Sequence, residues 1–349
     1  MSDKLSGAWQ KSTADELSNG DALSGISLRT FMPDDASRMV SLQKRCLDLC
    51  PDISVLPEGF YHGPSFEGGK NILCAIDDTG GHIGHAMVSV GHIHRRLGTR
   101  MLWMDLRVDP ALEKEVPGRG AALRDLLLVR ITARARQLAA DLERPAMLYA
   151  TYFARGQAGV EYLKSRGFEP FERIIQLRRD LERPIPTFEP PVGVEVRPWR
   201  METEAEQRRY LDAYDAAFAN EGKRLDQLQH FMKSSVWAGG TTITAFDGDR
   251  VVGSVMAYFN PDRGRNPDRV GATEYVFVRP EWRRRGIARY LLARTLRYLK
   301  VREMAYASLE VLADNGPALL LYRSVGYEPW REEISLGIPL TKEGIWTAT

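Results

Sequence analysis

The sequence predicts a mixed α/β fold of two tandem domains, each a mixed, mostly antiparallel sheet flanked by helices. The chain has 349 residues, more than one compact domain usually holds. Residues 182–193 contain four prolines, which exclude a helix or a central strand and predict a semi-rigid linker. The same order of strand and helix patterns occurs on both sides of this linker, about 160–170 residues apart, which indicates a duplicated domain.

These observations divide the chain into four predicted parts. Residues 1–25 are rich in small and polar residues and lack an apolar signal core, so we expect a flexible tail rather than a targeting segment. Residues 26–181 form an N-terminal domain and residues 182–193 form the linker. Residues 194–349 form a C-terminal domain.

The N-terminal domain begins with a predicted strand at residues 26–29, followed by a helical pattern through residue 49. Residues 72–77 and 83–90 flank a Gly-Gly turn and predict a hairpin. Residues 101–108 predict the next strand, before a turn that contains glycine and a long amphipathic helix. A further strand, a short helix and the sequence Gly-Phe-Glu-Pro close the domain.

The C-terminal domain repeats this order and closes on Gly-Tyr-Glu-Pro. Its predicted strands before the long helix are residues 194–197, 242–247, 251–258 and 273–278. Because strands and helices alternate after an early hairpin, we expect helices on both faces of each sheet.

Composition limits the classes of function. Lysine plus arginine number 48 and aspartate plus glutamate number 46, a balance that argues against a chain that binds nucleic acid over its whole surface. No apolar run is long enough to span a membrane. The three cysteines, Cys46, Cys50 and Cys74, give no disulfide framework, and we expect no metal site at Cys46 and Cys50. The sequence therefore predicts a soluble cytoplasmic protein.

A turn after the strand at residues 273–278 is the first candidate for chemistry. Pro280 ends the strand, and Arg283 to Ala288 form a turn that opens a helix running to about residue 300. A helix N-terminus offers unpaired N–H groups, and Gly286 lets the backbone approach a ligand closely. With four nearby arginines this predicts a pyrophosphate cradle. Taken alone, the arginine run is more typical of a solvated basic face, and least typical of a surface that binds nucleic acid.

A second passage, residues 309–327, predicts a strand, a loop and a short helix. Asp314 or Asn315 caps this helix, and Gly326 ends it. Tyr322 follows Asn315 by about two helical turns, so both side chains are expected near one face.

The two passages together resemble the Gcn5-related N-acetyltransferases. The hallmark Gln/Arg-x-x-Gly-x-Gly/Ala of that family is matched by Arg283 to Ala288. Its second segment, Asn-x-x-Ala-x-x-x-Tyr closing on Gly-Phe or Gly-Tyr, is matched by Asn315, Ala318, Tyr322, Gly326 and Tyr327. The resemblance covers roughly residues 194–340, and residues 26–180 resemble the same family with departures.

The resemblance implies an enzyme that transfers an acetyl group from acetyl-coenzyme A to an amine, without a metal. The backbone near Val276 to Val278 would pair with the pantetheine arm, the amides from Arg284 to Arg289 would hold the pyrophosphate, and Tyr322 would protonate the departing thiolate. The implied cofactor-binding residues are Val276, Phe277, Val278, Arg283, Arg284, Arg285, Gly286, Ile287, Ala288, Arg289 and Asn315.

The transfer also needs a base for the amine proton, and two carboxylates are candidates. Glu274 lies two residues before Val276 and is expected on the same strand face, beside the acetyl group. Glu310, on the next strand, is the second candidate. A plain salt bridge explains either residue equally well.

The N-terminal copy departs from the family pattern. Glu115 replaces the leading Gln or Arg of the loop, and about Gly156 and Leu163 stand where the other copy has Asn315 and Tyr322. Tyr162 is adjacent but rotated by ~100° on the helix. Three outcomes fit: a structural domain, a domain that binds the coenzyme without turnover, or a second active site.

The acceptor is expected to be the amine of a small molecule, bound near residues 210–237. Acids in that stretch are available for a cationic amine: Asp212, Asp215, Glu221 and Asp226. A protein amine is an alternative acceptor, and an acyl-coenzyme A sensor or scaffold without turnover is an alternative function. We expect a monomer or homodimer, with neither nucleic acid nor membrane as a partner.

Overall fold

The computed structural model describes residues 22–47, 55–94, 96–154, 157–218, 223–262 and 266–340. The chain forms two compact units, Met1–Pro170 with Leu336–Thr349, and Phe171–Ser335. We call them unit 1 and unit 2. Of the positions singled out in the sequence, most of the predicted tail, Cys50, Gly156 and Glu221 lie outside the described residues.

Unit 1 contains the sheet order β1-β2-β3-β4-β5. Neighbouring strands are antiparallel except β4 and β5, which are parallel. Gly337, near the end of the last strand of the chain, lies against Met147 and Leu148 of β5. The elements are β1 (Ser27–Thr30), α1 (Asp35–Leu47), η2 (Glu58–His62), η3 (Pro64–Gly69), β2 (Ile72–Ile76), β3 (His82–Ile93), β4 (Arg100–Val108), α2 (Ala111–Glu115), α3 (Arg119–Ala140), β5 (Ala146–Phe153) and α4 (Gln157–Ser165).

Unit 2 contains the sheet order β6-β11-β10-β9-β8-β7. Only β10 and β11 are parallel among these neighbours. The mixed α/β class predicted from the sequence is confirmed. The elements are β6 (Glu169–Asp180), β7 (Glu195–Trp199), α5 (Glu204–Ala217), α6 (Leu225–Met232), η4 (Ser235–Trp237), β8 (Thr241–Asp247), β9 (Arg250–Tyr258), β10 (Val270–Val278), η5 (Pro280–Trp282), α7 (Ile287–Val301), β11 (Tyr306–Leu312), α8 (Gly316–Ser324) and β12 (Glu328–Leu340).

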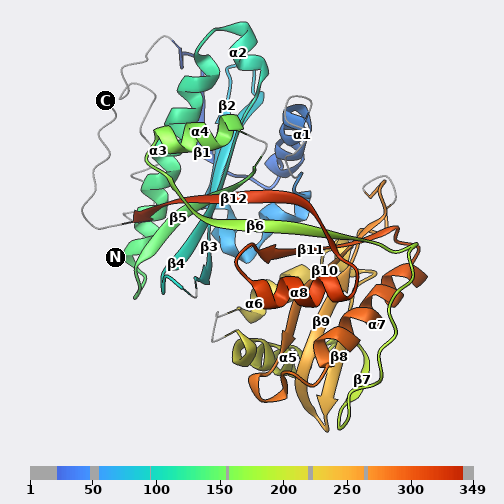
Figure 1. Cartoon of the computed structure of the whole chain (residues 1–349). Helices are drawn as coiled ribbons and strands as arrows, with labels where there is room; N and C mark the ends of the chain where they lie inside the picture. The colour runs from blue at the N-terminus through green and yellow to red at the C-terminus, as the bar shows by residue number, and fades with distance from the viewer. Residues whose placement is uncertain are drawn as a thin grey trace. The chain divides into compact units, whose positions relative to one another are not determined.

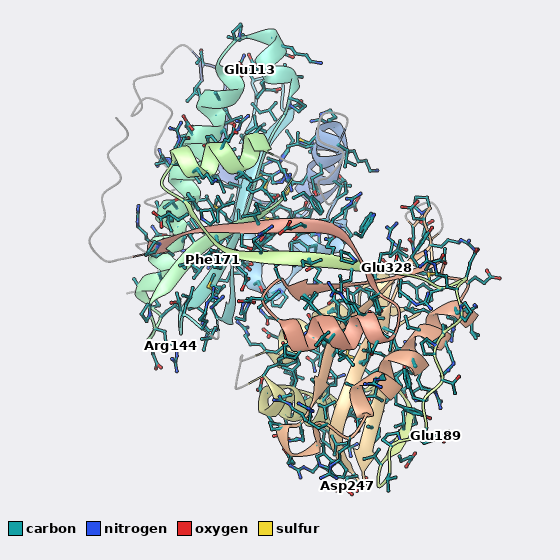
Figure 2. All side chains as sticks on the ribbon, viewed as in Figure 1. Glu113, Arg144, Phe171, Glu189, Asp247 and Glu328 are labelled. Atoms are coloured by element: carbon teal, nitrogen blue, oxygen red, sulfur yellow. The ribbon has the colours of Figure 1, made fainter. Side chains whose placement is uncertain are left out.

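The boundary between the units falls within β6, before Phe171, which is labelled in Figure 2. Residues 174–180 of β6 pair with β11, so this strand follows the first repeat in sequence and adds to the sheet of unit 2. The last residues of β12 follow the second repeat and belong to unit 1. The boundaries given above for the tail, the two domains and the linker remain predictions from the sequence.

Two apolar layers cover opposite faces of the unit 2 sheet. Side chains alternate along a strand, so Val255 and Met256 of β9 point to opposite faces. Val255 packs in a core with Leu291 and Leu296 of α7, whereas Met256 packs in a core with Tyr210 of α5. Helices α7 and α8 therefore cover one face and α5 and α6 the other (Figure 1).

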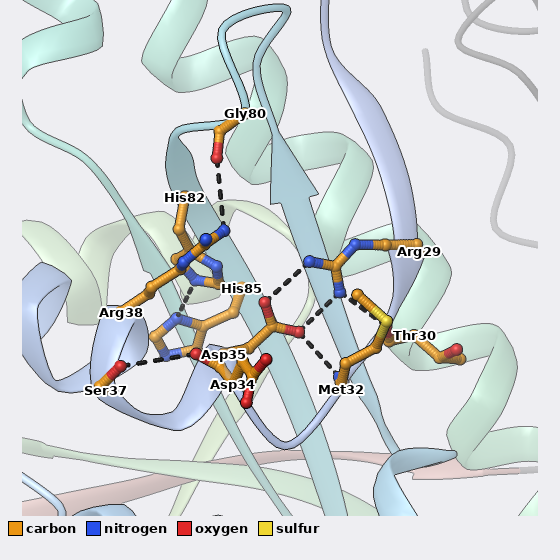
Figure 3. Close-up of polar contacts among 10 residues, drawn as sticks. All are labelled: Arg29, Thr30, Met32, Asp34, Asp35, Ser37, Arg38, Gly80, His82 and His85. Carbon is orange, nitrogen blue, oxygen red and sulfur yellow. Dashed lines mark hydrogen bonds and ion pairs between the residues drawn. The ribbon is translucent and has the colours of Figure 1, made fainter.

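A buried pair of histidines lies under α1 in unit 1 (Figure 3). His82 Nε2 and His85 Nδ1 are 3.3 Å apart, and among the described residues the other ring nitrogen of each has no partner. Burial lowers the pKa of both imidazoles, that of His82 to about 4. The neighbouring carboxylate of Asp35 is held by two hydrogen bonds from Arg29, so it is already paired.

We expect the free energy of unfolding to decrease as the pH falls from about 6.5 towards 4. The unfolded chain binds protons in this range and the buried imidazoles do not, so the effect reaches about 3 kcal/mol. Urea unfolding across this pH range measures it. The variant His82→Gln/His85→Gln should flatten the slope, and His62→Gln, at an exposed position, should leave it unchanged. An unaltered slope in the double variant would contradict the assignment.

Candidate functional site

Strands β10 and β11 of unit 2 separate partway along their length. Their parallel pairing joins Val270–Ala272 to Tyr306–Ser308 and then ends, although β10 continues to Val278 and β11 to Leu312. Each strand stays paired on its other side, β10 with β9 and β11 with β6. Among the described strands none covers the gap, so the main chain of β10 beyond Ala272 can pair with an extended ligand in the manner of an added strand.

Thr273 marks the point where the two strands separate. Its hydroxyl is 3.1 Å from the carbonyl oxygen of Ser308 on β11 and 2.5 Å from the hydroxyl of Tyr327. Both Thr273 and Tyr327 are buried. A polar contact of this kind holds the two strands together at the closed end of the gap, so the opening starts at a defined residue.

A β-bulge in β10 redirects the side chains beside the gap. Two residues, Tyr275 and Val276, stand opposite one residue of β9, between the pairs Glu274–Met256 and Phe277–Ser254. Tyr275 has φ 49°, a left-handed conformation that costs a residue with a Cβ about 1–2 kcal/mol. The predicted shared face of Glu274 and Val276 is therefore wrong. Val276 packs on the α7 core, whereas Glu274 shares the α5 face with its cross-strand partner.

The loop that follows β10 opens helix α7 with unpaired main-chain donors. Gly286 is the N-cap, with φ 78°, and no side chain caps the helix. A Cβ on Gly286 would meet no atom within 4 Å, so the space above this N-terminus is open. Arg284 is also left-handed, with φ 65°. The first amides of α7, at Ile287, Ala288 and Arg289, suit the phosphate groups of a nucleotide cofactor.

The arginines of this loop have separate contacts. Arg283 Nε donates to the carbonyl of Val278 at 3.1 Å, and its Nη2 donates to the carbonyl of Ala217 at 2.9 Å, so its side chain supports the loop. Arg285 lies over the ring of Trp282, and Arg289 lies over Phe188. Arg284 is exposed. The main chain, with Arg284, Arg285 and Arg289 around it, is thus the part of this loop that suits a phosphate ligand.

Tyr322 lies on α8 with 8% of its surface exposed. No described residue hydrogen-bonds to its hydroxyl, and burial raises its pKa to about 12, so the phenol is protonated at neutral pH. Asn315 caps α8 by accepting a hydrogen bond from the amide of Ala318 at 3.2 Å. Tyr322 packs in the α7 core, on the face of the sheet opposite Glu274, and Asn315 is the N-cap of the same helix.

Glu274 and Glu310 lie on the strands that flank the gap, and Glu333 lies on β12, the neighbour of β6. Tyr258 donates to Glu274 at 2.5 Å, and Gln176 donates to Glu310 at 3.2 Å and to Glu333 at 2.6 Å. Burial is the first cause that raises the pKa of each carboxyl, that of Glu333 to about 7. Like-charge repulsion adds to the shift of Glu310 and Glu333. This arrangement favours a cationic partner.

Sequence patterns missed Tyr258, Gln176 and Glu333. Gln176 lies on β6 and Glu333 on β12, the strands that follow Gly-Phe-Glu-Pro and Gly-Tyr-Glu-Pro. The two residues are far apart in the chain, so no local sequence pattern connects them. Of the acids expected near the acceptor, Asp212 pairs with Arg279 and Asp226 with Arg224, and Asp215 is half-buried. Asp212 and Asp226 are thus committed to ion pairs.

Unit 1 repeats the backbone of this site with different side chains. Its β4 and β5 pair over Arg100–Trp103 and Ala146–Tyr149 and then separate, and Gly118 caps α3 with φ 84°. Here the carboxylate of Glu113, a residue labelled in Figure 2, accepts a hydrogen bond from the amide of Gly118, the N-cap of α3, at 2.8 Å. An acid was expected at this loop, but Glu113, rather than Glu115, makes that contact.

The counterpart of Tyr322 is also altered in unit 1. Leu163 is buried with 1% exposed, and the hydroxyl of Tyr162 donates to Asp125 at 2.8 Å. Asp125 is also paired with Arg166. Tyr162 is therefore held in a structural hydrogen bond.

Comparison with known proteins agrees with this geometry. Residues 199–327 match the model of the acetyltransferase (GNAT) family, a span that includes the Gly286 loop and Tyr322. The chain therefore contains a domain of this acetyltransferase family. It is an N-acetyltransferase, and this family generally uses acetyl-coenzyme A.

Several acetyltransferases are similar over much of the chain. The mycothiol acetyltransferase of Geodermatophilus obscurus is 27% identical over 281 residues, covering 79% of this chain and 83% of that protein. The mycothiol acetyltransferase of Acidothermus cellulolyticus is 29% identical over 181 residues, covering 48% of this chain and 55% of that protein. The tandem arrangement resembles that of mycothiol synthase.

Solved structures show the same fold at low identity. A GCN5-related N-acetyltransferase from Sphaerobacter thermophilus superposes with a TM-score of 0.64 at 20% identity, over 92% of this chain and 98% of that one. A tandem GNAT protein from the clavulanic acid biosynthesis pathway gives 0.65 at 16% identity, over 91% and 100%. Within the described residues of this acetyltransferase, no helix is long and apolar enough to cross a membrane, and no group of three metal-ligand side chains was found.

The two glycine caps provide a matched test of cofactor binding. We expect Gly286→Ala to weaken acetyl-coenzyme A binding roughly tenfold, about the loss of one hydrogen bond to a charged group. Both Gly286→Ala and Gly118→Ala should cost about 1–2 kcal/mol of unfolding free energy, because each φ is left-handed. Calorimetric titration and urea unfolding measure the two effects. Equal loss of affinity in both variants would contradict a cofactor site confined to unit 2.

Proposed function

We propose that unit 2 transfers an acetyl group directly from acetyl-coenzyme A to the amine of a small molecule, in the gap between β10 and β11. The observation that carries this is the placement of Glu274 and Tyr322 on opposite faces beside an uncovered stretch of β10. With a base on one face and an acid on the other, the amine can attack from the side of Glu274 and the thiolate can leave towards Tyr322.

Acetyl-coenzyme A supplies a thioester carbonyl that an amine can attack. The first amides of α7 after Gly286 would hold its diphosphate, and the main chain of Val276, Phe277 and Val278 would pair with its extended arm. The side chain of Phe277 is buried in the α5 core and that of Val278 in the α7 core. The backbone of these residues is therefore the part that can pair with the cofactor. Asn315 caps α8 at the same opening.

Glu274 would take a proton from the ammonium of the acceptor, so that the neutral amine can attack the thioester carbonyl. Burial raises the pKa of this carboxyl, and the Tyr258 hydroxyl and the Lys223 charge partly oppose that shift. A carboxylate with a raised pKa is a better match for a proton acceptor near neutral pH. Glu310 would support the positive charge of the acceptor from the next strand.

Tyr322 would donate a proton to the departing thiolate. With its pKa raised to about 12 by burial, it stays protonated throughout the working range of pH. Because its hydroxyl has no hydrogen-bond partner among the described residues, it is available for a partner that arrives with the substrate.

We assign unit 1 a structural role. Glu113 accepts the hydrogen bond at the helix N-terminus where a phosphate would lie, and Leu163 replaces the acid. The curated relatives are mycothiol acetyltransferases, which supports a small-molecule amine rather than a protein amine as the acceptor. We further propose a cytoplasmic protein, consistent with the few cysteines.

Glu274→Gln tests the base. We expect kcat/KM of the unaltered chain to rise with pH through the pKa of Glu274, above the ordinary carboxyl range, because the base must be deprotonated. The variant should lower kcat about 100-fold and lose this rise, while cofactor affinity stays the same. Thiol release across an amine panel measures the rate. An unchanged pH profile in Glu274→Gln would exclude Glu274 as the base.

Tyr322→Phe tests the acid. It should lower kcat about 100-fold with little change in unfolding free energy, because no hydrogen bond within the described chain is lost. The control Tyr298→Phe removes a hydroxyl that donates to the carbonyl of Gly239 at 2.6 Å. It should cost about 1 kcal/mol of stability and keep kcat. A full rate for Tyr322→Phe would remove it from the mechanism.

A further inference from the structure

A lysine lies beside the bulge of β10. The ammonium of Lys223 is 3.1 Å from the ring centroid of Tyr275 and 5.5 Å from that of Tyr214. Tyr275 is the left-handed residue of the bulge and immediately follows Glu274 in sequence. The positive charge of this lysine is therefore held at the part of the strand where the amine is proposed to react.

The surroundings of this ammonium suit a cation in general. Tyr214 packs edge-on against Tyr275 with ring centroids 5.7 Å apart, and Phe218 packs against Tyr214 at 4.6 Å. Aromatic faces attract ammonium groups, more strongly where water is excluded. Glu274, the residue before Tyr275, adds a carboxylate whose pKa is raised by burial, and the positive charge of Lys223 opposes that rise. We call Tyr214, Tyr275 and Glu274 the ammonium subsite.

We propose that the ammonium subsite receives the amine of the acceptor, and that Lys223 occupies it in the free enzyme as an internal acceptor that becomes acetylated. The proposal rests on the function proposed for unit 2. It assigns Lys223 as a modification site, in competition with the external substrate.

The reaction at Lys223 has the same balance as the reaction with an external amine. Glu274 takes one proton from the Nζ ammonium, and the neutral nitrogen attacks the thioester carbonyl. A C–N bond forms, the C–S bond breaks, and the thiolate leaves as coenzyme A after receiving a proton from Tyr322. The nitrogen then carries two protons, of which it loses one to solvent and keeps the other as the amide N–H. Exchange with solvent returns a proton to Tyr322 and removes one from Glu274. The product is one N-acetyl-lysine and one free thiol, with no oxidant or reductant.

The same geometry specifies the class of the external acceptor. Lysine reaches the subsite with a primary ammonium at the end of an unbranched chain, so the subsite fits a primary amine on a slender arm. The aromatic faces of Tyr214 and Tyr275 attract a charged amine that has lost its hydrating water, and Glu274 can remove a proton from it. An external acceptor of this class must displace Lys223 before it reacts.

Mass spectrometry of the full chain incubated with acetyl-coenzyme A tests the proposal. We expect acetylation of Lys223 at least about tenfold faster than of exposed Lys233, because Lys223 is held next to the reacting groups. The rate constant should be independent of protein concentration, and Glu274→Gln should remove the difference. Acetylation of Lys223 at the rate of Lys233, or transfer only between molecules, would overturn the proposal.

A measurement without the cofactor tests the occupancy. Reductive methylation with ¹³C-formaldehyde labels the lysines, and Lys223→Arg identifies the signal of Lys223. We expect a ring-current shift of this signal from Tyr275, which butylammonium reduces. A Lys223 signal at the ordinary lysine position would overturn the proposal. Thiol release with external amines in that case would leave the proposed function intact. If none of the amines tested caused thiol release, the proposed function itself would be refuted.

Discussion

The separation of β10 and β11 is the constraint on which the site depends. Parallel strands gain by pairing along their whole length, yet here the ladder ends at Ala272 and Ser308. The bulge at Tyr275 twists β10, and Thr273 bonds to Ser308 and Tyr327 at the closed end. Strands β9 and β6 still pair with the outer edges of β10 and β11, so a paired strand borders the opening on each side. Without it, neither an extended ligand nor the flanking side chains would have a place.

The duplication shows which parts of such a site are backbone and which are chemistry. Both units keep separating parallel strands and a left-handed glycine at the helix cap, at Gly118 and Gly286. In both units an ion pair also links the first helix to the residue after the strand that borders the gap. In unit 1 the helix supplies the cation, Arg45 with Asp109, and in unit 2 it supplies the anion, Asp212 with Arg279. Because the glycine cap is present in both, the donors at the helix N-terminus do not distinguish unit 1 from unit 2. Glu113 in unit 1 does, since it presents a negative charge where a phosphate would have to bind.

The electrostatics of unit 2 divide it into two sides. Arginines and unpaired amides surround the start of α7, which suits an anionic cofactor. Glu274 and Glu310 lie on the two strands that flank the gap, and Glu333 lies on β12, on the far side of β6, which together suit a cationic acceptor. Gln176 donates to two of these carboxylates, so part of their repulsion is offset by hydrogen bonds rather than by ion pairs. A basic nucleotide side and an acidic amine side are what a transfer between these reactants requires.

The sequence by itself determined the α/β class, the duplication, the helix that starts at Gly286 and the position of Tyr322 on α8, because these follow from local periodicity, glycine conformation and the spacing within one helix. It did not determine that Glu274 and Val276 face opposite sides, since a bulge arises from pairing with β9 and leaves no local pattern. It also could not bring Tyr258, Gln176 and Glu333 to the carboxylates, or Lys223 to Tyr275. Those contacts join segments far apart in the chain, and only the packed sheet decides which of them meet.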